Sequence, residues 1–368
     1  MDFDFTDEQA LLRQSVERFV ADRYGFEARR AILASGPGWS RVIWNGLAEL
    51  GVTALTVPEE HGGLGGGPVE TMLAMAALGE GLVVEPVLAS AVIATELITA
   101  SGDATAEAAL LPALASGERI FAPALYERGA RYDAGAPGTR ARRIGAGYGL
   151  DGDKLALCGG GAADAFLVSA RLDEGLALFL VEAGAPGLLV QRERGYDGTP
   201  VATLAFDDLR LAASARIGGE AGSAIRSAID IAVAALAAEA VGVMRRAVAL
   251  TADYLRTRQQ FGRPIGAFQA LQHACVDMFV ASEEAWSAAL LAAGRCRDAD
   301  PTRRRKAIAA AKVTINKSAR LVGQKAIQLH GGVGMTDEYA ISHYFRRLTA
   351  IERQFGDADH WLKAYAQA

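Results

Sequence analysis

Cysteine and histidine are scarce in this sequence, which limits the chemistry that it can support. Three cysteines (Cys158, Cys275 and Cys296) and five histidines occur in 368 residues. The cysteines are too few and too scattered for a disulfide framework, and no pair of them has metal-ligand spacing with a histidine. We therefore predict that the protein has no structural metal.

The sequence also lacks charge blocks of one sign and long apolar runs. The formal net charge is −5, and acidic and basic residues alternate along the chain. This pattern argues against nucleic acid and against an anionic membrane as partners. The start, Met1 to Phe5, has no basic segment followed by an apolar stretch, and no later run approaches the roughly 20 apolar residues of a membrane span. We expect a cytoplasmic globular protein.

The chain is long enough for two or three domains with proper cores. Residues 1–120 read as a helical domain, in which Thr6 and Gln9 form a capping box before apolar residues at helical spacing. Glycine-rich residues 57–68 form a loop within this domain, because such glycine density forbids a helix.

Residues 121–220 follow a period of two, which predicts a β-barrel-like middle domain. Asp151-Gly152 is a hairpin signal, residues 166–168 and 178–181 are typical of buried strands, and residues 201–211 partly alternate. Gly159 to Gly161 fits a hairpin or loop better than a phosphate-binding fingerprint, because the chain lacks the strand and helix alternation of a doubly wound sheet.

Residues 221–368 read as a C-terminal antiparallel four-helix bundle. A long helix begins near residue 222 and is ended by Gly262 and Pro264, and further helices are expected at about 267–297, 302–329 and 336–366. The predicted fold class is therefore α+β, mainly α, with helical, β and helical domains in that order.

The segment from Arg256 to Gln269 is the first candidate for a binding function. It joins a helix end to a tight loop and carries guanidinium groups, two amides and two aromatic rings, which would suit an anionic, planar ligand. A solvated helix end whose arginines cap carbonyl groups is the more common use of such a segment.

The segment from Gln328 to Met335 is the second candidate. Successive glycines after a helix can turn several backbone N–H groups toward one anion, as phosphate-binding nests do. A glycine C-cap followed by a turn explains the same residues without any ligand.

Together the two segments resemble the Arg-x-x-Phe-Gly and Gln-x-x-Gly-Gly signatures of the acyl-CoA dehydrogenase family, and residues 58–66 resemble its N-terminal loop. The resemblance covers nearly the whole chain and its domain order, and implies the acyl-CoA dehydrogenase fold with FAD as cofactor. In the family these segments hold the pyrophosphate and adenine of an FAD bound mainly by a neighbouring subunit. The residues that inherit this role are Arg258, Gln260, Phe261, Phe268, Gln269, Gln328, Leu329, His330, Gly331 and Gly332.

The resemblance also implies the reaction. A glutamate base removes a proton from the α-carbon of an acyl-CoA while a hydride leaves the β-carbon for the flavin, which gives a trans-2-enoyl-CoA. Electrons would then pass to electron-transfer flavoprotein; acyl-CoA oxidases, which pass electrons to oxygen, share much of the fold, and chain length favours the dehydrogenase.

This sequence departs from the family at the base. Matching Phe355-Gly356-Asp357 to the usual Glu-Gly-Thr places Phe355 at the base position, and the alternative position in the long central helix is Ala232. Neither side chain can accept a proton, so no catalytic residue is expected in this chain.

The substrate and flavin contacts are altered as well. Asp230 matches a coenzyme A contact, but Val233 replaces the arginine that usually follows. The strand that in the family carries a tryptophan and a threonine against the flavin corresponds to residues 154–158, which contain neither.

These losses point to one subunit of an α2β2 enzyme, in which a larger partner supplies the glutamate. A first alternative is a self-sufficient enzyme that uses Glu352, Asp230 or Glu239 as an unusual base. A second alternative is a structural or regulatory paralogue, against which the retained Arg258, Gln260 and glycine loop argue. The substrate would be a dicarboxylyl-, fatty- or steroid side-chain acyl-CoA.

Overall fold

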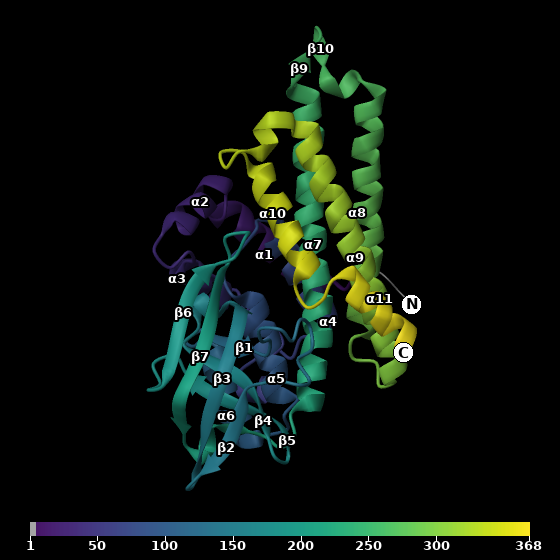
Figure 1. Cartoon of the computed structure of the whole chain (residues 1–368). Coiled ribbons are helices and arrows are strands. Elements are labelled where there is room, and N and C mark those ends of the chain that lie inside the picture. The colour runs from purple at the N-terminus through teal and green to yellow at the C-terminus, as the bar shows by residue number, and fades with distance from the viewer. Residues whose placement is uncertain (1–4) are drawn as a thin grey trace. The chain divides into compact units, whose positions relative to one another are not determined.

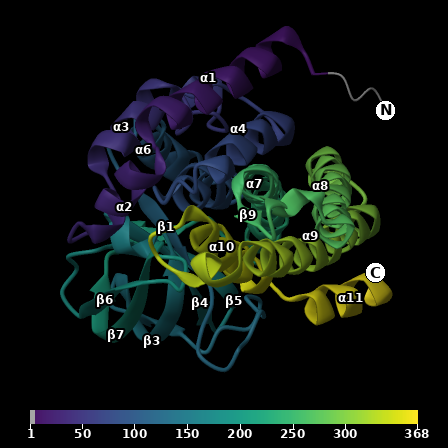
Figure 2. The same cartoon turned by 90° about the horizontal axis from the view of Figure 1, so that it is seen from above.

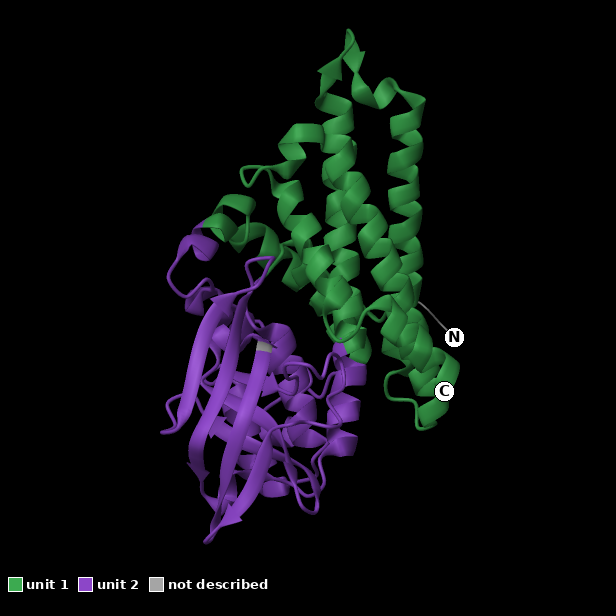
Figure 3. Ribbon diagram, viewed as in Figure 1, with its two compact units in different colours: residues 1–30, 68–83, 233–368 green, residues 31–67, 84–232 purple. Residues whose placement is uncertain are grey.

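The computed structural model of the protein describes residues 5–368 apart from the side chain of Ala156. The chain divides into two compact units that do not follow its order (Figure 3). Unit 1 comprises Met1–Arg30, Pro68–Val83 and Val233–Ala368, and unit 2 comprises Ala31–Gly67 and Val84–Ala232. Each unit therefore draws its core from segments that are far apart in the sequence.

Unit 1 is helical, and its four longest C-terminal helices run alternately up and down (Figure 1). Its helices are α1 (Asp7–Arg23), α4 (Pro68–Glu80), the greater part of α7 (Gly222–Thr257), α8 (Gln269–Arg295), α9 (Pro301–His330), α10 (Ala340–Arg353) and α11 (Ala358–Gln367). Seen from above, α7, α8, α9 and α10 form the predicted bundle and α4 lies alongside it (Figure 2). The capping box of Thr6 and Gln9 begins α1 as expected.

Helix α7 is long and apolar. An 18-residue window in it has a mean hydropathy of 1.8, enough by length and composition to cross a membrane, but 89% of that window is buried within the protein. The expectation that no run approaches the apolarity of a membrane span was wrong, because α7 reaches it by length and composition. Burial by neighbouring helices explains the composition of α7 without a membrane.

The fourth predicted helix, 336–366, is two helices instead of one. Helix α10 ends at Arg353 and α11 begins at Ala358, with Asp357 as its N-cap. Phe355 has φ 58° and Gly356 has φ 121°, so neither residue can continue a right-handed helix. The periodicity continues across the break, which is why the sequence pattern did not show it.

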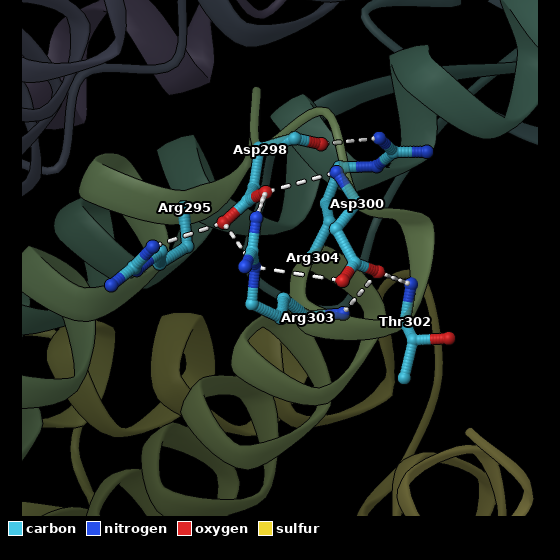
Figure 4. Close-up of polar contacts among 6 residues, drawn as sticks. All are labelled: Arg295, Asp298, Asp300, Thr302, Arg303 and Arg304. Atoms are coloured by element: carbon cyan, nitrogen blue, oxygen red, sulfur yellow. Dashed lines mark hydrogen bonds and ion pairs between the residues drawn. The ribbon is translucent and has the colours of Figure 1, made fainter.

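The turn between α8 and α9 is held by a buried carboxylate (Figure 4). Asp298 accepts hydrogen bonds from Arg295 at 3.0 Å, from Arg303 at 3.1 Å and from the backbone N–H of Asp300 at 2.9 Å. Chiefly because of the Arg303 hydrogen bond, the pKa of Asp298 falls to about 2. Asp300 caps α9 and Pro301 occupies its first turn.

Unit 2 contains shorter helices and all of the long strands. The helices are α3 (Arg41–Glu49), α5 (Thr95–Thr99) and α6 (Ala104–Ala115), together with a π-helical turn at Leu88–Ala94. Helix α2 (Phe26–Ala34) begins in unit 1 and enters unit 2 at Ala31. Trp44 is completely buried, and its indole N–H donates to Gly117 O at 2.8 Å. The predicted glycine-rich loop 57–68 contains a 3-10 turn at Glu59–His61 and ends at Pro68, the first residue of α4.

The strands of unit 2 form one mixed sheet in the order β6-β7-β3-β2-β4-β5-β8, with β1 parallel to β4. Their bounds are β1 Phe121–Ala124, β2 Arg140–Ile144, β3 Gly147–Cys158, β4 Ala165–Leu172, β5 Gly175–Glu182, β6 Leu188–Arg194, β7 Pro200–Leu211 and β8 Arg216–Ile217. The strands predicted at 166–168 and 178–181 are the buried centres of β4 and β5.

The hairpin predicted at Asp151-Gly152 is wrong, because these residues lie inside the continuous strand β3. The turn is at residues 145–146, between Ile144 and its partner Gly147. Gly152, with φ 136°, marks a shift of register between β3 and β7 instead. Residues 160–162 form a 3-10 turn after β3, which agrees with the prediction of a loop at the three glycines.

Candidate FAD-binding segments and base positions

The first candidate segment folds into a small hairpin at the end of α7. Strands β9 (Gln259–Gln260) and β10 (Arg263–Pro264) pair in antiparallel fashion, with Phe261 and Gly262 at the turn. Both turn residues have positive φ, 54° and 74°, as in a type I′ turn. Phenylalanine is strained in this conformation, yet 88% of its surface is exposed.

The hairpin presents cationic, amide and aromatic groups to solvent. Arg258, Gln260 and Gln269 are exposed. In the described part of the chain, the Arg258 guanidinium has no hydrogen bond or ion pair. The guanidinium of Arg263 lies 4.3 Å from the centre of the Phe268 ring, whose edge-to-face neighbour is Phe261 at 5.9 Å. This set of groups fits a ligand with a negative charge and a planar ring.

The glycine segment at the end of α9 forms the helix cap that the sequence allowed. Gly331 has φ 64° and caps the helix, since its N–H donates to the carbonyl groups of Gln328 and Ile327. Gly332 lacks a positive φ, and a Cβ atom at either glycine would meet nothing within 4 Å. The chain itself does not require glycine at 332, whereas a ligand or a second subunit that approaches this backbone closely would.

Aromatic stacking joins the two segments inside unit 1. The His330 ring stacks on Tyr254 with 4.5 Å between centres, and Tyr254 O accepts from the N–H of Arg258 at 2.8 Å. Leu329 and His330 are buried, at 7% and 3% exposure, while Gln328, Gly331 and Gly332 are exposed. Of the five predicted FAD-binding residues at this loop, three are therefore exposed and two are buried. The stacking of Tyr254 on His330 has no signal in the sequence.

The residues after the glycine segment are anchored by a buried histidine. His343 Nε2 lies 3.0 Å from Asp337 O, so Nε2 must donate, and Nδ1 then accepts from Arg29 Nη1 at 2.8 Å. Arg29 is 2% exposed and also donates to Leu82 O at 2.9 Å. Burial, with a further contribution from Arg29, lowers the pKa of His343. The neutral imidazole is therefore part of the folded structure.

We expect acid to destabilise the protein through His343. Because its folded-state pKa is lowered, stability is complete above the unfolded-state value of about 6.5 and declines as the pH falls below it, by at most about 1.4 kcal/mol per pH unit. Denaturant unfolding at pH 7.5, 6.5 and 5.5 should show a smaller decline in His343→Gln than in the wild type. Equal slopes for the two proteins would contradict this assignment.

The usual base position is held firmly but carries no proton acceptor. Phe355 O accepts from the indole N–H of Trp361 at 2.9 Å, and Gly356 O accepts from Asn316 at 3.3 Å. Lys312, fully buried, donates to Ile351 O at 2.6 Å near the end of α10. The turn is thus built to place residue 355, and the residue placed there is a phenylalanine.

The second base position lies on α7 and is equally apolar. Ala232 and Val233 are fully buried, and Asp230 is 5% exposed. A methyl group stands where a carboxylate would be required, and the isopropyl group of Val233 cannot pair with a phosphate.

The other carboxylates proposed as unusual bases are occupied by arginines. Glu352 is 8% exposed and accepts from Arg320 Nε at 3.2 Å. Glu239 accepts two hydrogen bonds from Arg347, at 2.6 and 2.9 Å. A cleft of about 230 Å³ adjoins Glu352, but its lining is charged and polar and does not suit an acyl chain. The lining residues are Asn316, Lys317, Arg320, Glu352, Arg353, Asp357, Ala358 and Asp359.

The end of strand β3, residues 154–158, corresponds to the strand that faces the flavin in the family. Lys154 is fully buried and donates to Glu127 at 2.6 Å and to Ser169 at 3.0 Å. The register with β7 shifts between Lys154 and Leu157. Neither a tryptophan nor a threonine occurs from Lys154 to Cys158, so this strand does not fit the aromatic and hydroxyl contacts of a flavin ring.

Sequence comparison decides the family. The chain matches the acyl-CoA dehydrogenase N-terminal domain at residues 6–118, the middle domain at 122–209 and the C-terminal domain at 230–359. It belongs to the acyl-CoA dehydrogenase family. Acyl-CoA dehydrogenases are oxidoreductases that act on CH–CH groups, and their cofactor is FAD.

Individual relatives cover almost the entire chain. Acryloyl-CoA reductase (NADH) of Anaerotignum propionicum is 30% identical over 98% of this chain and 93% of the relative. Among solved structures, the ChsE4-ChsE5 complex of Mycobacterium tuberculosis is similar with a TM-score of 0.91 and 28% identity, covering 100% of this chain and 98% of the other. The steroid acyl-CoA dehydrogenase Tcur3481-Tcur3483 is similar with a TM-score of 0.88 and 30% identity, covering 98% and 97%.

Proposed function

We propose that this acyl-CoA dehydrogenase chain is the small subunit of an α2β2 enzyme, whose larger subunit supplies the catalytic base. One observation carries the proposal: both base positions are apolar, while the exposed segments that would contact a partner's FAD are intact. Two of the similar structures bear paired names, and one of them is titled a complex. A homo-oligomer of this chain would have the two segments that contact FAD but no proton acceptor at base position 355 or 232.

Within such an assembly this chain would bind the cofactor from outside. Arg258 would contact the pyrophosphate, the backbone around Gly331 and Gly332 would approach the adenosine portion, and Phe261 would cover a ring. FAD supplies the hydride-accepting chemistry when bound. The residues of this chain bind and orient it and exclude water, while the partner's carboxylate moves the proton.

The proposed reaction is α,β-desaturation of an acyl-CoA to a trans-2-enoyl-CoA, with electron-transfer flavoprotein as electron acceptor. For the acyl group we propose the dicarboxylyl, fatty or steroid side-chain class. The chain resembles the small subunit of bacterial pimeloyl-CoA dehydrogenase, and a similar structure is titled a steroid acyl-CoA dehydrogenase. A self-sufficient enzyme is less well supported, because Glu239 and Glu352 are ion-paired.

Purification tests this proposal directly. We expect the chain to be colourless and inactive alone, and yellow and active when co-expressed with a base-containing acyl-CoA dehydrogenase subunit encoded beside it. Flavin absorbance, native mass and enoyl-CoA formation are the measurements. A yellow, active homo-oligomer would refute the two-subunit assignment.

A variant pair tests the contact with FAD. Arg258→Ala should lose most flavin from the complex, because a charge-assisted contact to a phosphate is removed. Arg256→Ala is the matched control, since Arg256 lies two residues earlier, is exposed and pairs with Asp253 at 2.9 Å. Equal flavin content in the two variants would count against the proposed role of Arg258.

A further inference from the structure

His343, in the first turn of α10, uses both ring nitrogens to join parts of unit 1 that are far apart in the sequence. Nδ1 accepts a hydrogen bond from Arg29 Nη1 of α2 at 2.8 Å, and Nε2 donates to Asp337 O at 3.0 Å. Asp337 belongs to loop 336–339, which connects the glycine segment at the end of α9 to α10. The neutral imidazole is therefore a bridge between α2 and this loop.

A second proton on the ring is incompatible with this bridge. Nδ1 would become a donor that faces the guanidinium of Arg29, which is always charged and cannot accept a hydrogen bond. His343 and Arg29 are 6% and 2% exposed, so little water can screen the two positive charges. Because a buried cation beside another cation is costly, protonation favours a conformation in which the ring has left Arg29.

The other charged groups around the ring do not offset this repulsion. Arg346, on the same helix, adds positive charge, and the carboxylate of Asp337 accepts a hydrogen bond from Arg346 Nη2 at 2.6 Å. From α2, Phe26 presents an apolar ring whose centre lies 5.1 Å from that of His343. Burial lowers the pKa of His343 most, the hydrogen bond to Asp337 O raises it, and Arg29 and Arg346 lower it further.

Loop 336–339 lies at the surface beside the glycine segment. Asp337 and Glu338 are exposed, as are Gly331 and Gly332. Exposed segments with few buried apolar side chains open at a lower free energy than the core of a protein. Release of Asp337 O can therefore free this loop without unfolding the helices, and the freed loop changes the backbone next to the two glycines.

We propose that His343 is a pH switch for the glycine segment: the neutral ring holds loop 336–339 in place, and the protonated ring releases it. The switch itself is a property of this chain alone. Its consequence for the cofactor rests on the proposed function, in which Gly331 and Gly332 approach an FAD bound mainly by the partner subunit. Acid would then open this contact with FAD.

Hydrogen exchange of the full-length protein tests the switch. The released ring has the ordinary pKa of about 6.5 and the closed structure has a lower pKa, so closure is complete above about pH 6.5 and is lost as the pH falls. After correction for the chemical exchange rate, opening of residues 331–343 should increase up to about 10-fold between pH 7.5 and 5.5. The N–H of Thr336, which donates to Val333 O at 3.2 Å, is one of the amides that report this opening.

Residues 308–326 of α9 are the internal reference, because most of them are buried and none belongs to the loop. Their exchange should not change between the two pH values. A constant rate for residues 331–343 would overturn the proposal, since the loop would not open in acid. An equal rise in both segments would also overturn it, because it would report general unfolding.

His343→Gln removes the titration and keeps groups for both contacts. Its side-chain amide can accept from Arg29 and donate to Asp337 O, so we expect equal opening at pH 7.5 and 5.5. His273→Gln is the matched control: His273 is exposed in α8, and its variant should respond to acid as the wild type does. A His343→Gln protein that still opens in acid would show that another group controls the loop. Should His343→Gln not fold, the comparison of the two wild-type segments decides the question.

Exchange in the complex with the base-containing subunit separates the switch from the proposed function. At pH 7.5 we expect residues 331–343 to exchange more slowly in the FAD-loaded complex than after removal of FAD. If acid opens the loop but FAD does not protect it, the switch stands and the proposed contact of the glycine segment with FAD is wrong. If FAD protects the loop but acid does not open it, the switch is wrong and the proposed function stands.

Discussion

Replacing Arg347 with leucine should destabilise the protein by about 3–5 kcal/mol. Arg347 and Glu239 are 8% and 6% exposed and share two hydrogen bonds of 2.6 and 2.9 Å. Removal of the arginine leaves a buried carboxylate with no compensating charge, and this loss greatly exceeds the value of a surface ion pair. Urea unfolding of the wild type and the variant measures the difference.

The double variant Glu239→Leu with Arg347→Leu is the decisive control. Two apolar side chains of similar volume remove the desolvation cost of both charges, so stability should return to within about 1 kcal/mol of the wild type, or exceed it. If the two single losses simply add in the double variant, the pair is not coupled and the prediction is wrong. The same double variant examines Glu239 as a base, because full activity of its assembled complex would exclude that role.

The ion pair also shows where reasoning from sequence stops. Local patterns predicted α7, α8 and α9 of unit 1, since their apolar residues recur at helical spacing. Glu239 and Arg347 are 108 residues apart in the chain. No local pattern indicates that they meet, and each alone is an ordinary charged residue on a helix. The same holds for Arg29 with His343.

Backbone conformation explains most of the remaining differences between the predicted and the observed secondary structure. Asp151-Gly152 is a typical turn dipeptide, but strand pairing on both sides kept it within β3, where glycine allows a shift of register. Phe355 adopts a positive φ that phenylalanine rarely takes, so composition alone could not place the break between α10 and α11. In both cases tertiary contacts override the local preference.

The positions of the two candidate binding segments could be predicted from the sequence, because each segment is a short motif. The hairpin of Arg258 to Arg263 and the glycine cap at Gly331 occupy the expected ends of α7 and α9. The sequence could not separate Leu329 and His330, which face the interior, from Gln328, which is exposed. Side-chain direction at a helix end depends on the cap geometry, which is set by the three-dimensional packing.

Gly242→Ala should be at least as damaging as the loss of Arg347, although alanine is the better helix former. A Cβ atom at Gly242 in α7 would lie 1.9 Å from Ala76 O in α4. The partner is backbone, so the contact can be relieved only by moving one helix away from the other. Gly79 repeats the arrangement from α4, where a Cβ atom would lie 2.2 Å from Glu239 O. The two glycines let the helices of unit 1 approach at this crossing.

We therefore expect Gly242→Ala to cost about 3 kcal/mol or more, with the sign opposite to the gain of about 1 kcal/mol that helix propensity alone predicts. Gly294→Ala is the matched control: Gly294 is exposed in α8, and its Cβ would meet nothing within 4 Å. That variant should be neutral or slightly more stable. Comparison of the urea midpoints is sufficient, because a Gly242→Ala protein as stable as Gly294→Ala would show that α4 and α7 do not cross this closely.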